Sequence, residues 1–216
     1  MSIQKTYAVF GLGRYGQAVA QELVKNGAEV LAVDIDQTTV NNAIETIPVC
    51  RCADITEPEA IKRLGIANID VVIVAMASNL EASVMAVTLC KEAGVKTVIA
   101  KCSNEMQQKI LLRVGADRVV FPEYESGLRL AKNLLSSGFI DMISLSKDVS
   151  IVEIDVKAEW CGKNLIELNL RKKYGFNIIA IKKGEKVNVN INPEQVLDAQ
   201  STLIVIANTT KLGKLK

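Results

Sequence analysis

The chain has 216 residues, 49% of them apolar, which is enough to bury a core in one domain of ordinary size and in a smaller second one. Its 26 basic and 24 acidic residues are interspersed and leave a net charge of +2, which argues against a nucleic-acid partner. Apolar runs are too short for a membrane helix, and no export signal begins the sequence. We therefore expect a soluble, cytoplasmic protein.

The cysteines are odd in number, and the sequence contains no histidine that could complete a mixed zinc site. They are Cys50, Cys52, Cys90, Cys102 and Cys161. In a chain without an export signal such cysteines are typically reduced. We expect them to be packing residues, mostly buried.

Residues 6–121 alternate between short β-branched runs and stretches of helical periodicity. The runs are 6–10, 29–34, 47–52, 70–75, 97–101 and 118–121. One helix is predicted from Arg14 to a stop at Gly27, and two more begin after the capping residues Asn79 and Asn104. Apolar strands separated regularly by helices predict a parallel sheet covered on both faces, a Rossmann-like, doubly wound α/β domain over residues 1–121.

The pattern changes after Pro122. A helix with Leu128, Ala131, Leu134 and Leu135 on one stripe is followed by a break and a short apolar piece, 139–145. This stripe suits either a core or a bridge between domains or subunits. We expect 122–146 to be a helical connector and dimerisation hinge.

Residues 147–216 have the pattern of a different module. Strands are predicted over 150–156, 177–183 and 202–207, with a helical segment at 163–175. This predicts a small α+β domain, which is too small for a typical catalytic domain.

The segment "FGLGRYG" contains a G-x-G-x-x-G spacing at Gly11, Gly13 and Gly16. The spacing alone is weak evidence, but a strand precedes it, a helix follows, and Asp34 ends the next strand. The first glycine allows a tight turn, the second lets a phosphate approach, and the third lets helix and strand pack closely. Together with an acidic acceptor for ribose hydroxyls, the loop predicts nucleotide binding at a helix N-terminus.

Two residues narrow the choice of nucleotide. Asp34 opposes a 2′-phosphate and so disfavours NADP. Arg14 is either a solvated charge or a phosphate clamp, and the second reading favours ADP or ATP over a dinucleotide. Without histidine, and with no evident general acid or base, we assign no catalytic residue and expect no enzyme. A small NAD-dependent oxidoreductase is the less favoured alternative.

Longer motifs resemble a known family. They are "VFGLGRYGQAVAQEL", "EVLAVDID", "VVIVAMASNLEASVMAV", "VIAKCSNEMQQKILLRVGADRVVFPE" and "KNLIELNLRKKYGFNIIAIKKG". Together they are similar to the cytosolic RCK (KTN) regulatory subunits of bacterial Ktr/Trk-type potassium uptake systems, most closely the Ktr type. The resemblance spans essentially the whole chain and implies an RCK nucleotide-binding domain followed by a small RCK C-terminal domain.

The resemblance also implies a function. Proteins of this kind bind ATP or ADP, assemble from dimers into an octameric ring, and gate a potassium channel subunit at the inner face of the cell membrane. NAD or NADH stays open as a ligand. A regulator of another ion transporter is the alternative within the same family.

Site residues follow from the same resemblance. Arg14 corresponds to the contact of the terminal phosphate, Asp34 to the ribose acceptor, Lys101 to a lysine facing the phosphates, and Glu123 to a glutamate that holds a divalent or monovalent cation. The expected nucleotide site comprises Gly11, Leu12, Gly13, Arg14, Tyr15, Gly16, Asp34, Ile35, Asp54, Ile55, Thr56, Ala75, Met76, Ala77, Asn79 and Lys101. Of these, Asp54, Ile55 and Thr56 would flank the adenine.

The resemblance implies a second ligand in the C-terminal domain, cyclic di-AMP, bound between two copies. The corresponding residues are Leu165, Arg171, Asn177, Ile178 and Pro193. Apolar side chains at these places serve equally well as core. The segment "DAQST" departs from the Gly-Asp turn of many relatives, which makes the local turn uncertain.

Overall fold

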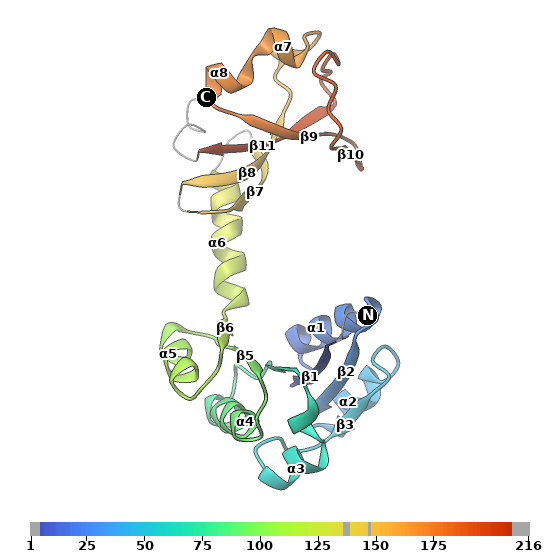
Figure 1. The fold of residues 1–216 in the computed structure, drawn as a ribbon, viewed down its shortest axis with the longest axis vertical. Coiled ribbons are helices and arrows are strands. Elements are labelled where there is room, and N and C mark those ends of the chain that lie inside the picture. Colours follow the sequence, from blue (N-terminus) through green and yellow to red (C-terminus); the bar gives the residue numbers. More distant parts are fainter. Residues whose placement is uncertain (1–4, 136–138, 147, 209–216) are drawn as a thin grey trace. The chain divides into compact units, whose positions relative to one another are not determined.

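A computed structural model describes residues 5–135, 139–146 and 148–208 (Figure 1). The chain divides into two compact units, Met1–Glu123 and Tyr124–Lys216. Each has its own hydrophobic core, so each is described by itself. No helix in the described ranges is long and apolar enough to cross a bilayer.

The first unit is built on a six-stranded parallel sheet in the order β3-β2-β1-β4-β5-β6. The strands are β1 (Thr6–Phe10), β2 (Glu29–Asp34), β3 (Cys50–Cys52), β4 (Val71–Val74), β5 (Thr97–Lys101) and β6 (Arg118–Val120). The central strand β4 is apolar throughout and all four of its residues are buried, because helices cover both faces of the sheet. This confirms the doubly wound fold predicted from the sequence.

The helices of this unit are α1 (Arg14–Lys25), α2 (Gln37–Ala43), α3 (Pro58–Arg63), the 3₁₀ turn η1 (Ile66–Asn68), α4 (Leu80–Glu92) and α5 (Glu105–Arg113). Three of them, α1, α4 and α5, begin where the sequence predicts. Asn79 accepts a hydrogen bond from the Ala82 amide at 3.0 Å, and Asn104 accepts one from the Gln107 amide at 2.9 Å. Both caps satisfy amides that a helix start leaves unpaired.

Strand order decides where a ligand can bind. From β1 the chain moves to β2 on one side, whereas β4, the other neighbour of β1, leads to β5 on the opposite side. Right-handed crossovers therefore send α1 and α4 to opposite faces of the sheet. A crevice opens at the carboxyl ends of β1 and β4, between the two diverging connections.

The second unit contains a five-stranded sheet in the order β10-β9-β11-β8-β7, with antiparallel pairs. Its elements are β7 (Phe139–Ser144), β8 (Val149–Asp155), the 3₁₀ turn η2 (Ala158–Trp160), α7 (Leu165–Leu168), α8 (Leu170–Tyr174), β9 (Asn177–Lys183), β10 (Lys186–Asn188) and β11 (Ser201–Asn208). Trp160, Phe176 and Leu203 are buried in its core. The expected α+β module is confirmed.

Helix α6 (Pro122–Leu135) begins in the first unit and continues into the second. It carries the predicted stripe: Leu128 is 44% exposed and Leu134 77% exposed. The side chain of Leu135 and residues 136–138 lie outside the described residues. Residues 139–144 depart from the expected helical connector because they form strand β7, paired with β8. The domain limits at 121 and 146 stay predictions.

All five cysteines are free thiols, and Cys50, Cys90 and Cys102 are buried. Burial raises the pKa of Cys90 to about 12. A buried thiol of this kind is inert and acts as a small apolar side chain.

Candidate nucleotide-binding site

A cleft of about 560 Å³ lies at the carboxyl edge of the first sheet. It is lined by Gly11, Val33, Asp34, Ile35, Ala53, Asp54, Ile55, Thr56, Glu57, Met76, Ser78, Asn79, Glu81, Ala82 and Met85. These residues follow β1, β2, β3 and β4 or belong to the start of α4. The cleft therefore lies where the sheet topology opens a crevice, and its volume is in the range of small-molecule sites.

The glycine loop joins β1 to α1, and two of its glycines are sterically required. Gly11 has φ +89°, and a Cβ there would approach Met76 Cγ to 2.5 Å. A Cβ at Gly16 would collide with the carbonyl oxygen of Gly11. Only glycine lets α1 pack this closely on the loop.

Gly13 is different because its Cβ position faces open space, with no atom within 4 Å. It is the N-cap of α1 and provides no side-chain cap. The first turn of this 12-residue helix also contains no acidic residue. A helix start without a side-chain cap or an acidic residue, together with the helix dipole, forms a ready site for an anion.

Asp34 ties the loop to the end of β2. Its Oδ2 accepts a hydrogen bond from the Leu12 amide at 2.6 Å, and its Oδ1 accepts one from the Asp36 amide at 3.0 Å. The carboxylate is half-buried and lines the cleft. A carboxylate has about four acceptor positions, so Asp34 keeps capacity for ribose hydroxyls while it holds the loop.

Asp54 and Thr56 form the far end of the cleft, after β3. Oδ1 of Asp54 accepts hydrogen bonds from the Thr56 amide at 2.9 Å and from its hydroxyl at 2.7 Å. These bonds, the hydroxyl first, lower the pKa of Asp54. The carboxylate is therefore ionised at neutral pH and is held in a defined orientation.

Apolar side chains complete the cleft between its two acidic ends. Ile55 is buried, whereas Ile35 is 68% exposed, and Met76 and Met85 approach from the side of β4 and α4. Flat aromatic rings such as nucleobases fit between apolar side chains of this kind, with polar groups at the rim fixing the orientation.

Charged residues gather beside the first turn of α1, outside the lining of the cleft. Lys101 Nζ donates to Glu123 Oε1 at 2.5 Å and lies 5.4 Å from the centre of the Tyr15 ring. The pKa of Glu123 is lowered, mainly by the hydrogen bond from Lys101 and in smaller part by the charge of Arg14. Two cations therefore lie near the open helix start.

The expected residues fall into two groups. The cleft lining brings together Gly11, Asp34, Ile35, Asp54, Ile55, Thr56, Met76 and Asn79. Leu12, Gly13, Arg14, Tyr15, Gly16, Ala75, Ala77 and Lys101 are not among the lining residues. Ala75 has a structural bond, since its amide donates to the Phe10 carbonyl at 2.7 Å and joins the ends of β1 and β4.

Several lining residues were not expected from the sequence. Glu81, Ala82 and Met85 line the cleft from the first turns of α4, and Glu57 lines it from the residue before α3. The cap at Asn79 was a usable signal, because a helix that starts at the crevice brings its first-turn side chains to the cleft.

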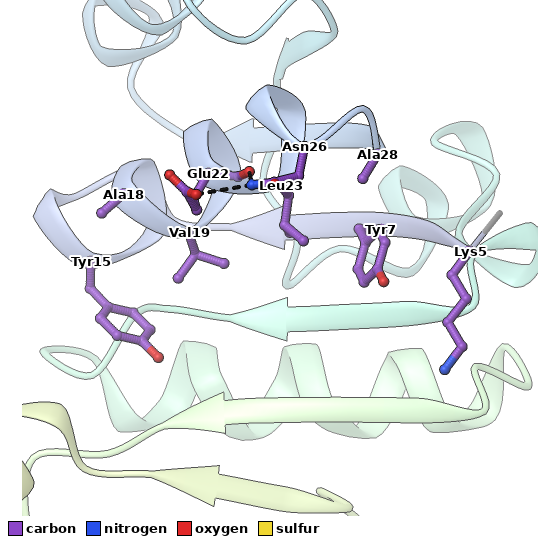
Figure 2. Close-up of a pocket in the computed structure, with 9 residues that line it drawn as sticks. All are labelled: Lys5, Tyr7, Tyr15, Ala18, Val19, Glu22, Leu23, Asn26 and Ala28. Carbon is purple, nitrogen blue, oxygen red and sulfur yellow. Dashed lines mark hydrogen bonds between the residues drawn. The ribbon is translucent and has the colours of Figure 1, made fainter. Parts of the chain in front are cut away.

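A larger hollow, of about 730 Å³, lies beside α1 and is mainly apolar (Figure 2). Figure 2 shows Tyr15 at the beginning of α1 and Tyr7 on β1, with Val19 and Leu23 along the helix between them. Asn26 donates to Glu22 Oε1 at 2.9 Å at its upper rim (Figure 2). The glycines of the loop are not among the residues that line this hollow.

A smaller pocket in the second unit has a volume of about 460 Å³. It is lined by Leu165, Ile166, Asn169, Leu170, Arg171, Phe176, Asn177 and Ile178. Four of the five residues expected for a second ligand are thus together, and the fifth, Pro193, accepts a hydrogen bond from the Leu165 amide at 3.1 Å.

No cluster of three or more cysteine, aspartate or glutamate side chains suited to a metal occurs in the ranges that the structure describes. Glu123 faces Lys101 instead of a second carboxylate. The expected cation at Glu123 stays a prediction.

Comparisons with known proteins agree with the two-domain fold. The TrkA-N domain matches residues 7–122, and the TrkA-C domain matches residues 149–216. The chain is 37% identical over 214 residues to the Ktr system potassium uptake protein C of Bacillus subtilis, covering 99% of this chain and 97% of that protein. It is 33% identical over 213 residues to the Ktr system potassium uptake protein A of Vibrio alginolyticus, covering 98% and 97%.

One solved structure extends the similarity in fold. A structure described as the GsuK channel bound to NAD has a TM-score of 0.65 at 17% identity, covering 99% of this chain and 39% of that chain. At this identity the likeness concerns the fold alone. From the two domain matches and the full-length relatives, the chain belongs to the RCK family of regulatory subunits of Ktr-type potassium uptake systems.

Proposed function

We propose that this protein is a nucleotide-sensing subunit that binds ATP or ADP in the cleft of the first unit and gates a membrane potassium channel. The observation that carries the proposal is the Asp34 carboxylate, which holds the glycine loop through the Leu12 amide at 2.6 Å beside an uncapped helix start. This arrangement joins a ribose acceptor directly to a phosphate-binding terminus.

The ligand extends along the carboxyl edge of the sheet. Its base lies between the apolar side chains near Asp54, its ribose at Asp34, and its phosphates at the first turn of α1. Arg14 and Lys101 lie beyond that turn and provide positive charge for the outer phosphates. Adenine nucleotides with two or three phosphates use the whole set of residues, whereas a nucleoside would leave both cations without a ligand.

NAD is the second candidate ligand. The strand order of the first sheet is that of dinucleotide-binding domains, and the cleft lies at the switch point where such ligands bind. Arg14 favours ATP and ADP because a fixed cation contributes more to a terminal phosphate than to a bridging pyrophosphate. The cleft serves sensing and not catalysis in this proposal.

We further propose that the subunit assembles into a ring of dimers at the inner face of the membrane, and helix α6 supports this proposal. Leu128, Leu130 and Leu134 are 44%, 59% and 77% exposed on this helix. Apolar side chains repeated along one helix are typical of a surface that another chain covers. We propose that α6 contributes to self-association of the subunit.

The pocket of the second unit is proposed to bind cyclic di-AMP between two copies. Arg171 at its rim suits a phosphate, and Leu165, Phe176 and Ile178 offer apolar surfaces for the bases. In this proposal cyclic di-AMP is a second ligand, in addition to the nucleotide that binds to the first unit.

Thermal-shift titration with ATP, ADP, NAD, NADH and cyclic di-AMP tests the proposal, since a ligand that binds the folded state raises its apparent stability. ATP and ADP should stabilise the protein most strongly. Arg14→Ala should reduce the difference between ATP and ADP, whereas Asp34→Ala should weaken both. Asp36→Ala removes the cap of α2 without touching the cleft and is the matched control. Stabilisation by NADH alone would contradict the proposal.

A further inference from the structure

Two of the side chains that line the nucleotide cleft carry sulfur, Met76 and Met85. They come from different places in the fold, because Met76 lies in the connection after β4 and Met85 lies in the second turn of α4. A Cβ at Gly11 would approach Met76 Cγ to 2.5 Å, so Met76 packs against the glycine loop. Met85 is 40% exposed. Its thioether is therefore the more accessible of the two to small molecules in solution.

Met85 belongs to the apolar wall of the cleft. Ala82, one turn earlier on α4, lines the cleft with it, and Ile35 and Ile55 line the cleft from the ends of β2 and β3. A thioether makes favourable contacts with an aromatic ring. A nucleobase bound between these apolar side chains would cover Met85 and exclude solvent from its sulfur.

A thioether is also a target for peroxides. The sulfur of methionine attacks one oxygen of hydrogen peroxide and the O–O bond breaks, so that sulfur is oxidised by two electrons to the sulfoxide and the peroxide is reduced to water. Methionine sulfoxide reductases reverse the step, in which two thiols become a disulfide and the oxygen leaves as water. The sulfoxide is polar and chiral, so it no longer provides an apolar surface.

We propose that Met85 is a peroxide-sensitive modification site that regulates the cleft: oxidation to the sulfoxide weakens nucleotide binding, and a bound nucleotide protects the sulfur. This proposal rests on the proposed nucleotide function of the cleft. The position of Met85 makes the modification regulatory, because a base that covers the sulfoxide separates a strong dipole from water. An oxidised subunit therefore loses its nucleotide at concentrations that saturate the reduced subunit.

Protection by ATP is the first measurement, and Met106 is its internal control. Met106, at the start of α5, is 66% exposed and is not among the residues that line the cleft. The full chain is treated with hydrogen peroxide in EDTA, and mass spectrometry of its peptides gives both oxidation rates. ATP at ten times its Kd should slow the oxidation of Met85 about tenfold, since only about a tenth of the clefts stay free. The rate at Met106 should not change.

Affinity is the second measurement. Calorimetry should show that protein oxidised without ATP binds ATP at least about tenfold more weakly than untreated protein, as expected when a polar group is covered without a partner. Treatment with methionine sulfoxide reductases should restore the affinity. Met85→Leu keeps an apolar side chain of similar size but has no sulfur. Whatever its affinity before treatment, this variant should show the same affinity after peroxide.

The variant also separates Met85 from Cys52, which is exposed and reacts with peroxide as well. Met85→Leu retains Cys52, so a loss of affinity that persists in the variant belongs to another residue. Absence of ATP binding by untreated protein would overturn the proposed function itself. If ATP binds but does not protect Met85, if oxidised and untreated protein bind ATP equally, or if Met85→Leu still loses affinity, the inference is wrong.

Discussion

At the scale of single residues, the three glycines of the loop have unequal roles. Gly11 and Gly16 are required by contact, because a methyl group at either place meets Met76 or the Gly11 carbonyl. Gly13 faces open space and has φ −64°, a value that alanine adopts freely. Its lack of a side chain therefore matters for a ligand that approaches the N-terminus of α1, and not for folding.

Comparison of two alanine variants separates these roles. Gly16→Ala should destabilise the protein by about 3 kcal/mol, because the packed helix and loop have to move apart. Gly13→Ala should change stability by less than about 0.5 kcal/mol and yet weaken ATP binding about tenfold, since its methyl group enters the space in front of the helix start. Urea unfolding and calorimetry measure the two effects. Normal ATP binding by Gly13→Ala would contradict the proposed position of the phosphates.

Because the thiol of Cys90 is buried, the stability of the protein should depend on pH in the alkaline range. Burial raises its pKa to about 12 in the folded protein, whereas an unfolded thiol titrates near about 8.5. The stabilisation that the buried, protonated thiol contributes is complete below the pKa of the unfolded state. It is lost as the pH rises toward the pKa of the folded state. Between the two, the unfolded state releases the proton first, and the free energy of unfolding falls by about 1.4 kcal/mol per pH unit.

From pH 8 to pH 10, the unmodified protein should therefore lose about 2 kcal/mol more stability than Cys90→Ala does, as measured by urea unfolding. Groups shared by both proteins cancel in this difference. Cys52→Ala, which changes an exposed cysteine, is the control and should follow the unmodified protein. Parallel curves for Cys90→Ala and the unmodified protein would show that the thiol is not buried in solution.

At the scale of elements, α6 carries several exposed apolar side chains among the described residues. Leu128, Leu130 and Leu134 are all exposed, in contrast to the buried faces of α1 and α4. Exposed apolar side chains on a helix are unfavourable for an isolated monomer, and association removes them from water.

Replacing Leu128 and Leu134 together by serine should therefore reduce the size of the assembly without changing its secondary structure. Light scattering after size-exclusion chromatography measures the mass, and far-ultraviolet circular dichroism checks the fold. Glu125→Gln, on the same helix, is the control and should keep the full mass. An unchanged mass for the double variant would exclude this stripe from the interface.

Periodicity predicted most elements of the first unit because its inner strands are largely buried apolar runs, such as β1 and β4, and the helices α4 and α5 have an asparagine cap and a following glycine. It could not assign 139–145, since a short apolar run is compatible with helix and strand alike until its pairing with β8 is known. β10 was missed because its three residues are all exposed and lie at a sheet edge.

The candidate site was also predictable only in part. Residues close in sequence to the glycine loop and to strand ends could be named from motifs. The bond from the Leu12 amide to Asp34 and the pairing of Lys101 with Glu123 join positions far apart in sequence, and depend on how strands lie side by side. Charge and spacing alone do not determine which partner a lysine selects.

At the scale of the whole molecule, each unit has its own core and its own candidate pocket. Compact units with separate cores can unfold separately. A ligand then stabilises only the unit that binds it.

Scanning calorimetry should accordingly resolve two transitions. ATP at a hundred times its Kd should stabilise the first unit by about 2.7 kcal/mol and leave the other transition in place. Cyclic di-AMP should do the reverse. Equal shifts of both transitions with ATP alone would indicate that the two cores unfold as one, contrary to this expectation.

The place of β11 in the second sheet has a consequence for biosynthesis. This strand, Ser201–Asn208, is the last of its sheet in the sequence and yet pairs with both β8 and β9. The second unit cannot close until the ribosome has released that strand, whereas every strand of the first unit has been translated by Val120. Because domains fold as units during synthesis, the nucleotide cleft is complete while the second unit is still being made. A nascent chain stalled near residue 180 should already be retained on immobilised ATP.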